Sequence, residues 1–144
     1  MRYFYLLISI LFCLSSALAD PGAKVSQGTT VSKLSTIYTG TITATTNGSA
    51  YYLPKLYSGL IFRQTATINS GTSPTLDTKI QHSIDGTTWV DLPSVAFTQL
   101  TAGTSTEELH IDVTKIKTGG RVRAVLTLGG TTPNVTAEVS VIHD

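Results

Sequence analysis

The sequence is poor in the residues that disulfides, metal sites and nucleic-acid sites require. Cysteine occurs once, at Cys13, so one chain cannot form an internal disulfide. Ten basic residues stand against nine acidic ones without a basic cluster, which excludes a nucleic-acid footprint. The three histidines are scattered, and no group of histidine, cysteine, aspartate and glutamate has metal-ligand spacing. We therefore expect no metal, no cofactor and no nucleic-acid partner.

A catalytic constellation is missing as well. His82, Ser83 and Asp85 are the residue types of a nucleophilic triad, but neighbours on one strand point to opposite faces and cannot align. Glu107 and Glu108 form an acidic pair, which is more typical of a solvated strand edge than of a general acid and base. We predict that the protein is not an enzyme and has no catalytic residue.

The first residues have the three parts of a secretory signal peptide. Arg2 is basic, residues 3–14 are apolar, and Ala17-Leu18-Ala19 has the small-residue pattern of a cleavage site. The apolar run is shorter than the roughly 20 residues of a membrane span, so we expect no stable span in the mature chain. We predict a signal peptide at 1–19 and a mature protein that is secreted or lies on a virion surface.

Threonine, serine, valine, isoleucine and glycine are abundant after the leader, and they favour strands and turns over helices. Apolar residues alternate with polar ones in 121–128 and 134–142, as in half-buried strands. We predict an all-β domain at 29–144, a single antiparallel β-sandwich of the jelly-roll or immunoglobulin-like kind, after a flexible arm at 20–28. The expected strands are 29–38, 40–46, 50–57, 59–69, 76–84, 87–92, 95–100, 107–113, 121–128 and 134–142.

A short sequence occurs twice. GTSPTLDTKI at 71–80 and GTTPNVTAEV at 130–139 both contain Gly-Thr-Ser/Thr-Pro before a strand-like stretch. Glycine allows a tight reversal, and proline at the start of a return strand sacrifices no ladder hydrogen bond. Chance in a threonine-rich chain is one explanation, and two similar hairpins are the other.

The stretch QHSIDGTTWVDL at 81–92 has the form of a hairpin. Asp85-Gly86 is a strong hairpin signal, since glycine readily takes positive φ and aspartate tolerates it. Ser83 and Asp85 can cap turn N–H groups, and Trp89 is expected to bury its ring against the first strand. We therefore predict a structural turn made by Ser83, Asp85, Gly86 and Trp89; sugar stacking by Trp89 is the alternative.

Three stretches occur in an order that resembles a known family: 71–92, AFTQLTAG at 96–103, and RVRAVLTLGGTTPNVTAEVSVI at 121–142. They resemble the small β-sandwich virion-associated or decoration-type structural proteins of tailed bacteriophages, over roughly residues 60–142. The resemblance implies a non-enzymatic protein that docks onto protein subunits, either its own copies or a larger particle. Such phage proteins usually lack a secretory signal, and the predicted leader departs from them.

Two other functions remain open. One is a secreted carbohydrate-binding module, for which Tyr51, Tyr52 and Tyr57 are possible ligand contacts if they form an exposed row. The other is a subunit of an extracellular filament, in which the arm from about Ala23 to Thr46 adds a strand to a neighbour's sheet edge. Concentration-dependent assembly would favour a structural role over glycan binding.

Overall fold

The computed structural model describes residues 32–54, 57, 59–112, 116 and 119–143. The predicted signal peptide and flexible arm lie outside these residues. The chain divides into two units, Met1–Thr30 and Val31–Asp144, and the fold described here belongs to the second. Among the described residues, no helix has the length and apolar character of a membrane span.

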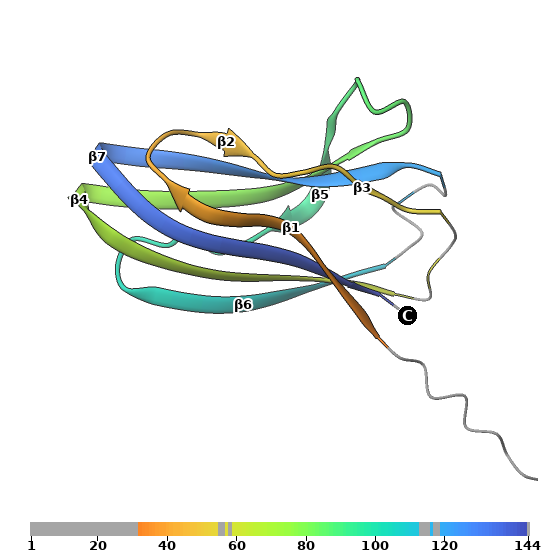
Figure 1. Cartoon of the computed structure of the whole chain (residues 1–144), viewed down its shortest axis with the longest axis horizontal. Coiled ribbons are helices and arrows are strands. Elements are labelled where there is room, and N and C mark those ends of the chain that lie inside the picture. Colours follow the sequence, from red (N-terminus) through yellow and green to blue (C-terminus); the bar gives the residue numbers. More distant parts are fainter. Residues whose placement is uncertain (1–31, 55–56, 58, 113–115, 117–118, 144) are drawn as a thin grey trace, which may run out of the picture. The chain divides into compact units, whose positions relative to one another are not determined.

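Regular structure in the described residues consists of seven strands (Figure 1). They are β1 (Lys33–Ile42), β2 (Thr46–Asn47), β3 (Tyr51–Tyr52), β4 (Leu60–Ser83), β5 (Val90–Ala96), β6 (Thr104–Ile111) and β7 (Arg121–His143). Every strand pair is antiparallel, in the order β1-β7-β4-β5, with β2 and β3 on β7 and β6 on β4. The prediction of an all-β antiparallel fold is confirmed for these residues.

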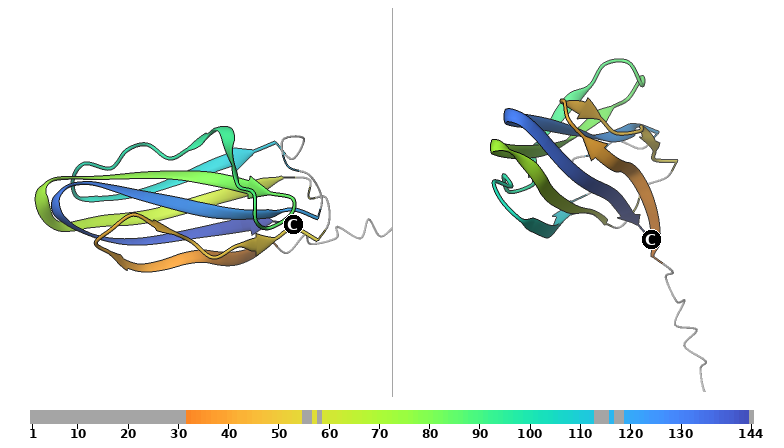
Figure 2. Two further views of the ribbon diagram at one scale, coloured as in Figure 1. Left: turned by 90° about the horizontal axis from the view of Figure 1, so that it is seen from above. Right: turned by 60° about the vertical axis from the view of Figure 1, so that its left-hand side comes forward.

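The long strands β4 and β7 divide this sheet into two halves. Both strands bend midway, where the register between them shifts three times (Figure 1). The β6 half contains β1, the second part of β7, the first part of β4, and β6. The β5 half contains β2, β3, the first part of β7, the second part of β4, and β5. Figure 2 shows β4 and β7 turning back at the same end of the sheet.

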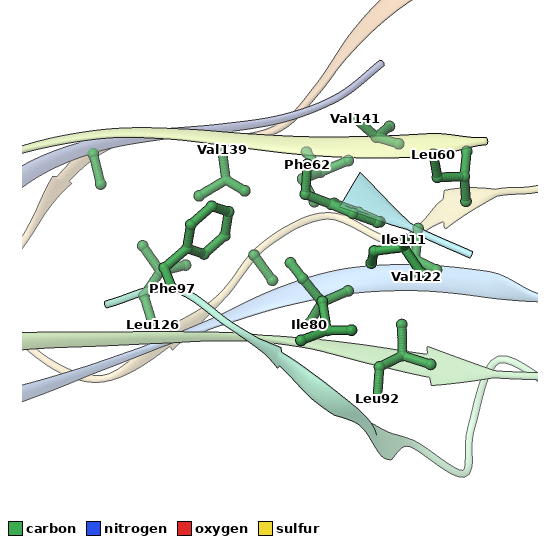
Figure 3. Packing of buried hydrophobic residues seen from close by; sticks show 14 of the residues in the cluster. Leu60, Phe62, Ile80, Leu92, Phe97, Ile111, Val122, Leu126, Val139 and Val141 are labelled. Carbon is green, nitrogen blue, oxygen red and sulfur yellow. The ribbon is translucent and has the colours of Figure 1, made fainter. Parts of the chain in front are cut away.

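The inward side chains of the two halves form one core (Figure 3). Leu60 and Phe62 come from the first part of β4, whereas Leu76 and Ile80 come from its second part. Successive strand residues point to opposite faces, so the apolar alternation decides which face turns inward. The β7 residues of the core follow the same rule: Val122, Ala124, Leu126, Val135, Ala137, Val139 and Val141.

The repeated Gly-Thr-Ser/Thr-Pro sequence forms the two bends. Gly71 and Gly130 have φ of 132° and 90°, and the residues before each proline, Ser73 and Thr132, have φ of 49° and 47°. The expected hairpins are wrong, because the two parts of each strand belong to opposite halves of the sheet and pair with other strands. The repeat therefore marks two matched bends, which lie side by side.

Several expected strand boundaries are also wrong. The break expected at residue 39 does not occur, because Gly40 stays in register with Ala137 inside β1. The break expected between 92 and 95 is absent, since β5 continues through Pro93 as an edge strand. Of the strand expected at 50–57, two residues form β3.

Candidate functional site

The hairpin turn between β4 and β5 is closed by side-chain hydrogen bonds. The Asp85 Oδ1 atom accepts the backbone N–H groups of Thr88 and Thr87, at 2.7 and 2.8 Å. The Ser83 hydroxyl donates to Asp85 Oδ1 at 2.9 Å and accepts the N–H of Gly86, whose φ is 78°. Three of the four residues predicted for the turn thus lie in one hydrogen-bonded loop.

The same hydrogen bonds stabilise the ionised form of Asp85. The backbone N–H of Thr88, then that of Thr87, and then the Thr88 and Ser83 hydroxyls hold the pKa of this carboxyl well below its usual range. The carboxylate is exposed, so its charge is solvated as well as hydrogen-bonded. The turn is therefore built around a carboxylate that remains charged in moderate acid.

Trp89 lies outside the core, contrary to the expectation from the sequence. It is half-buried and precedes the first residue of β5. The guanidinium carbon of Arg123 lies 4.2 Å from the centroid of its ring. Arg123 alternates with the inward residues Val122 and Ala124 of β7, so this contact is on the outer face of the β5 half.

Hydrogen bonds from neighbouring strands hold Arg123 in place. Gln81 Oε1 accepts its Nε and Nη2 hydrogens at 2.9 and 2.8 Å, while Gln81 Nε2 donates to Asp91 Oδ1 at 2.7 Å. Lys79 Nζ lies 2.6 Å from Asp91 Oδ2, and these two bonds lower the pKa of Asp91. We call this group, Lys79, Gln81, Trp89, Asp91 and Arg123, the Trp89 surface.

The three candidate tyrosines do not form an exposed row. Tyr52 is 52% exposed and lies under the guanidinium of Arg121, 6.0 Å away. The Tyr51 hydroxyl is 2.6 Å from His143 Nε2, and the buried ring of Tyr57 lies 4.6 Å from the His143 ring. Burial raises the pKa of Tyr57. Two of the three tyrosines thus support the end of the sheet, and Tyr52 alone of the three is exposed.

An open pocket of about 400 Å³ lies beside the turn. Two of its walls are apolar side chains that are well exposed, Ile84 at 60% and Val90 at 63%. The sequence indicated the turn but gave no sign of this hollow. Its lining residues are His82, Ser83, Ile84, Asp85, Thr88 and Val90.

The outer face of the β6 half carries hydroxyl groups, a pattern that the sequence analysis missed. The hydroxyl oxygens of Thr67 and Thr104 lie 2.9 Å apart, and those of Thr65 and Thr106 lie 3.1 Å apart. The missed signal was Thr-x-Thr, which occurs at 39–41, 41–43, 43–45, 65–67 and 104–106. We call the following residues the hydroxyl face: Thr36, Thr39, Thr41, Thr65, Thr67, Thr104, Thr106, Thr136 and Ser140.

Acidic and histidine side chains do not gather into a metal centre in the part of the chain that the structure describes. Ser83 and Asp85 do meet, but their hydrogen bond belongs to the closed turn. The two outer faces present different groups: an aromatic ring with cationic and acidic side chains on the face of the β5 half, and mainly hydroxyls, with Glu138 beside Ser140, on that of the β6 half.

No family model and no curated protein matches the chain. Among solved structures, a chain from the structure of infectious bursal disease virus, Gx strain, is similar with a TM-score of 0.45 and 16% identity. A chain from the Gt strain is similar with a TM-score of 0.45 and 13% identity. Each alignment covers 78% of this chain, but 28% and 33% of the viral chains, so this chain spans a third or less of their length.

Proposed function

We propose that this chain is a non-enzymatic structural protein that docks onto protein subunits, of the phage virion-associated or decoration type. In this proposal its folded sheet is a β-sandwich of the jelly-roll or immunoglobulin-like class, and it acts on a virion surface or as a secreted protein. The docking surface is the Trp89 surface. The observation that supports it best is the Arg123 guanidinium, held against the Trp89 ring by Gln81.

The residue types of this surface are those that contribute most binding energy in protein interfaces. Tryptophan, tyrosine and arginine are enriched among interface residues whose truncation weakens binding by about 2 kcal/mol or more. Trp89 and Arg123 lie together, and Tyr52 with Arg121 forms a second aromatic–cation pair in the same half. A partner that covers them would exclude water from both pairs.

The side chains of the Trp89 surface are already held in place in the free protein, which favours binding by this surface. Arg123 is fixed by Gln81, and Gln81 and Lys79 are both fixed by Asp91. Immobilising a long side chain on binding costs about 0.5–1.5 kcal/mol, and this cost is lower for a side chain that is already held in place. The hydrogen-bond network therefore prepares the surface for a partner.

Glycan binding is the second candidate, and the exposed ring of Tyr52 favours it. An aromatic side chain with an apolar face and a polar tip suits a wet binding surface. Two observations count against glycan binding. Arg123 covers the Trp89 ring, and the rings of Tyr51 and Tyr57 pack against His143, so neither is an exposed ring to which a glycan would bind. Protein docking is therefore the better-supported function.

The test is to purify virus-like particles from cells that carry the gene and to measure how much of the chain remains bound. Trp89→Ala and Arg123→Ala should each lower particle occupancy at least about tenfold at limiting concentration, which corresponds to roughly 1.4 kcal/mol. Thr65→Ala, on the hydroxyl face, is the matched control and should bind like the wild type. Particle binding by all variants at the wild-type level would contradict the proposed surface. If the wild type does not associate with particles but binds polysaccharide, and the Trp89 and Arg123 variants lose that binding, the glycan module is favoured.

A further inference from the structure

Strand β6 is an edge strand with one bonded side. Its residues pair with Leu60–Thr67 of β4 in a register without a break. In the described part of the chain, no other strand pairs with it. In Figure 1 it forms the lower rim of the sheet. An edge strand of this kind presents a row of backbone donors and acceptors to solvent.

One hydrogen bond shows which groups point outward. The N–H of Ile68 donates to the carbonyl of Gly103 at 2.9 Å, immediately before β6. Hydrogen-bonded and non-hydrogen-bonded pairs alternate in an antiparallel ladder, so the odd-numbered residues 105–111 turn their backbone groups toward β4. The outward N–H and C=O groups therefore belong to Thr104, Thr106, Glu108 and His110.

The other two long edges of the sheet are obstructed. On β5, Pro93 removes a donor, Ser94 has a φ of 61°, and the register with β4 shifts. On β1, the register shifts after Thr36, and the carbonyl of Ile37 already accepts the N–H of Ser49 at 2.7 Å. Proline, bulges and charged side chains, lysine above all, are the usual protections of an edge. Strand β6 has no proline, lysine or bulge, and its charged residues are Glu107 and Glu108.

We propose that the outer edge of β6 accepts, by β-strand addition, the segment that precedes β1 in a second copy of this chain. This inference rests on the structural role proposed above, but not on the Trp89 surface. The donor is 23–31, AKVSQGTTV, which has strand-forming residues at Val25, Thr29, Thr30 and Val31. Its Lys24 is opposite in charge to Glu108, which is exposed on β6, whereas Glu107 already accepts hydrogen bonds from Thr98.

The topology favours a second copy over the chain's own segment. Lys33 pairs with His143, His143 with Leu60, and Leu60 with Ile111, so β1 begins at the end of the half where β6 finishes. The two strands lie on opposite edges, and an added segment of the same chain would have to cross the ends of β7 and β4. If the β6 edge of a second copy lies beside the start of β1, the segment can reach that edge without crossing β7 and β4. Each copy then donates to the next, so the contact repeats head-to-tail.

A proline substitution tests the edge without removing a bond to β4. Thr106→Pro deletes an outward N–H, whereas Thr106→Val keeps that N–H and removes the hydroxyl. In sedimentation velocity of the processed full chain, wild type and Thr106→Val should assemble with rising concentration. Thr106→Pro should need at least about tenfold more protein, and Thr30→Pro in the donor segment should have the same effect. Equal assembly by all four chains, or a wild type that stays monomeric, overturns the proposal.

Amide hydrogen exchange of the wild type gives a test that does not depend on a variant folding. Outward amides of β6 should become at least about tenfold better protected when the protein assembles, while the amides bonded to β4 should be protected at every concentration. Protection of the outward amides in the dilute monomer would show that the chain's own segment binds there, and would overturn the role of a second copy. Trp89→Ala should assemble like the wild type, because Trp89 is not on β6. If Trp89 proves unimportant for particle binding, the assembly results for Thr106→Pro and Thr30→Pro still test the β6 edge.

Discussion

The two outer faces of the sheet cover one core, yet they differ in their chemistry. On the hydroxyl face, threonines of adjacent strands bond to one another, as Thr67 does to Thr104. On the Trp89 surface, charged and aromatic groups bond in a network centred on Gln81 and Arg123. The comparison shows that the inward residues of both halves are apolar, while the outward residues of the same strands differ in chemistry from one half to the other.

The faces also differ in how they treat their polar groups. Threonine pairs satisfy each other across the strands, and cross-strand pairs of this kind contribute roughly 0.2–1 kcal/mol each. The Trp89 surface holds the salt bridge between Lys79 and Asp91, both about half exposed, and its strength depends on solvent and salt. The neutral threonine pairs therefore depend little on salt, whereas the ion pair on the Trp89 surface should weaken as the salt concentration rises.

The largest expected effect comes from the core that both faces share. Phe62 is fully buried between the halves, so Phe62→Ala should lower the free energy of unfolding by about 3–5 kcal/mol. Because the halves share the core, Trp89 fluorescence and far-UV circular dichroism should report one common unfolding transition in urea. Two separate transitions would show that the halves fold independently and would break the comparison.

The next effect concerns the bends that join the halves. A Cβ at Gly130 would collide with the carbonyl oxygen of Ser73 and lie 2.7 Å from that of Thr72, whereas one at Gly103 would meet nothing within 4 Å. Both glycines have positive φ, so each alanine variant incurs the left-handed penalty of about 1–2 kcal/mol. Gly130→Ala should lose about 1–3 kcal/mol more than Gly103→Ala in urea unfolding, as overpacking does. Equal losses would mean that the bend yields to the new side chain.

Local patterns were enough to predict the inward face and the turn chemistry. Alternation at 121–128 and 134–142 placed Val122 and Val139 inside, and Asp85-Gly86 does form the loop between β4 and β5. The Gly-Thr-Ser/Thr-Pro repeat located both bends. Whether a bend joins paired strands or carries one strand into the opposite half depends on long-range pairing, which no local pattern contains.

The environment of Trp89 could not be predicted from the sequence for a similar reason. A tryptophan after a hairpin turn can lie on either face, and here β5 begins one residue later, at Val90. Its partner Arg123 is 34 positions away in the sequence and reaches it through the pairing of Gln81 with Arg123 across β4 and β7. The positions of Tyr51 and Tyr57 likewise depend on His143, a distant residue.

A smaller effect separates Trp89 from a core residue. The ring is half-buried and its specific contact is with Arg123, so Trp89→Ala should cost about 1 kcal/mol, as an exposed cation–π pair does. Arg123→Ala should lose a similar amount, and the double variant should lose less than the sum of the two. Urea midpoints of the four proteins give this coupling. A loss as large as that of Phe62→Ala would place Trp89 in the core and remove the distinction between the faces.

The smallest effect is the response of the β5 half to acid. The pKa of Asp85 is lowered by the N–H groups of Thr88 and Thr87, so between its folded pKa and the ordinary value of about 4 the unfolded chain binds more protons than the folded one. The contribution of Asp85 to stability is therefore complete above the ordinary value, and it is lost as pH falls through the folded pKa.

Asp85→Asn removes this titration, so its stability should depend less on pH in that acid range than that of the wild type. Hydrogen exchange should show the amides of Thr87 and Thr88 losing protection before that of Ser105, which is bonded to β4 in the other half. Loss of protection in both halves at the same pH would mean that acid acts on the shared core, and not on the β5 half through this turn.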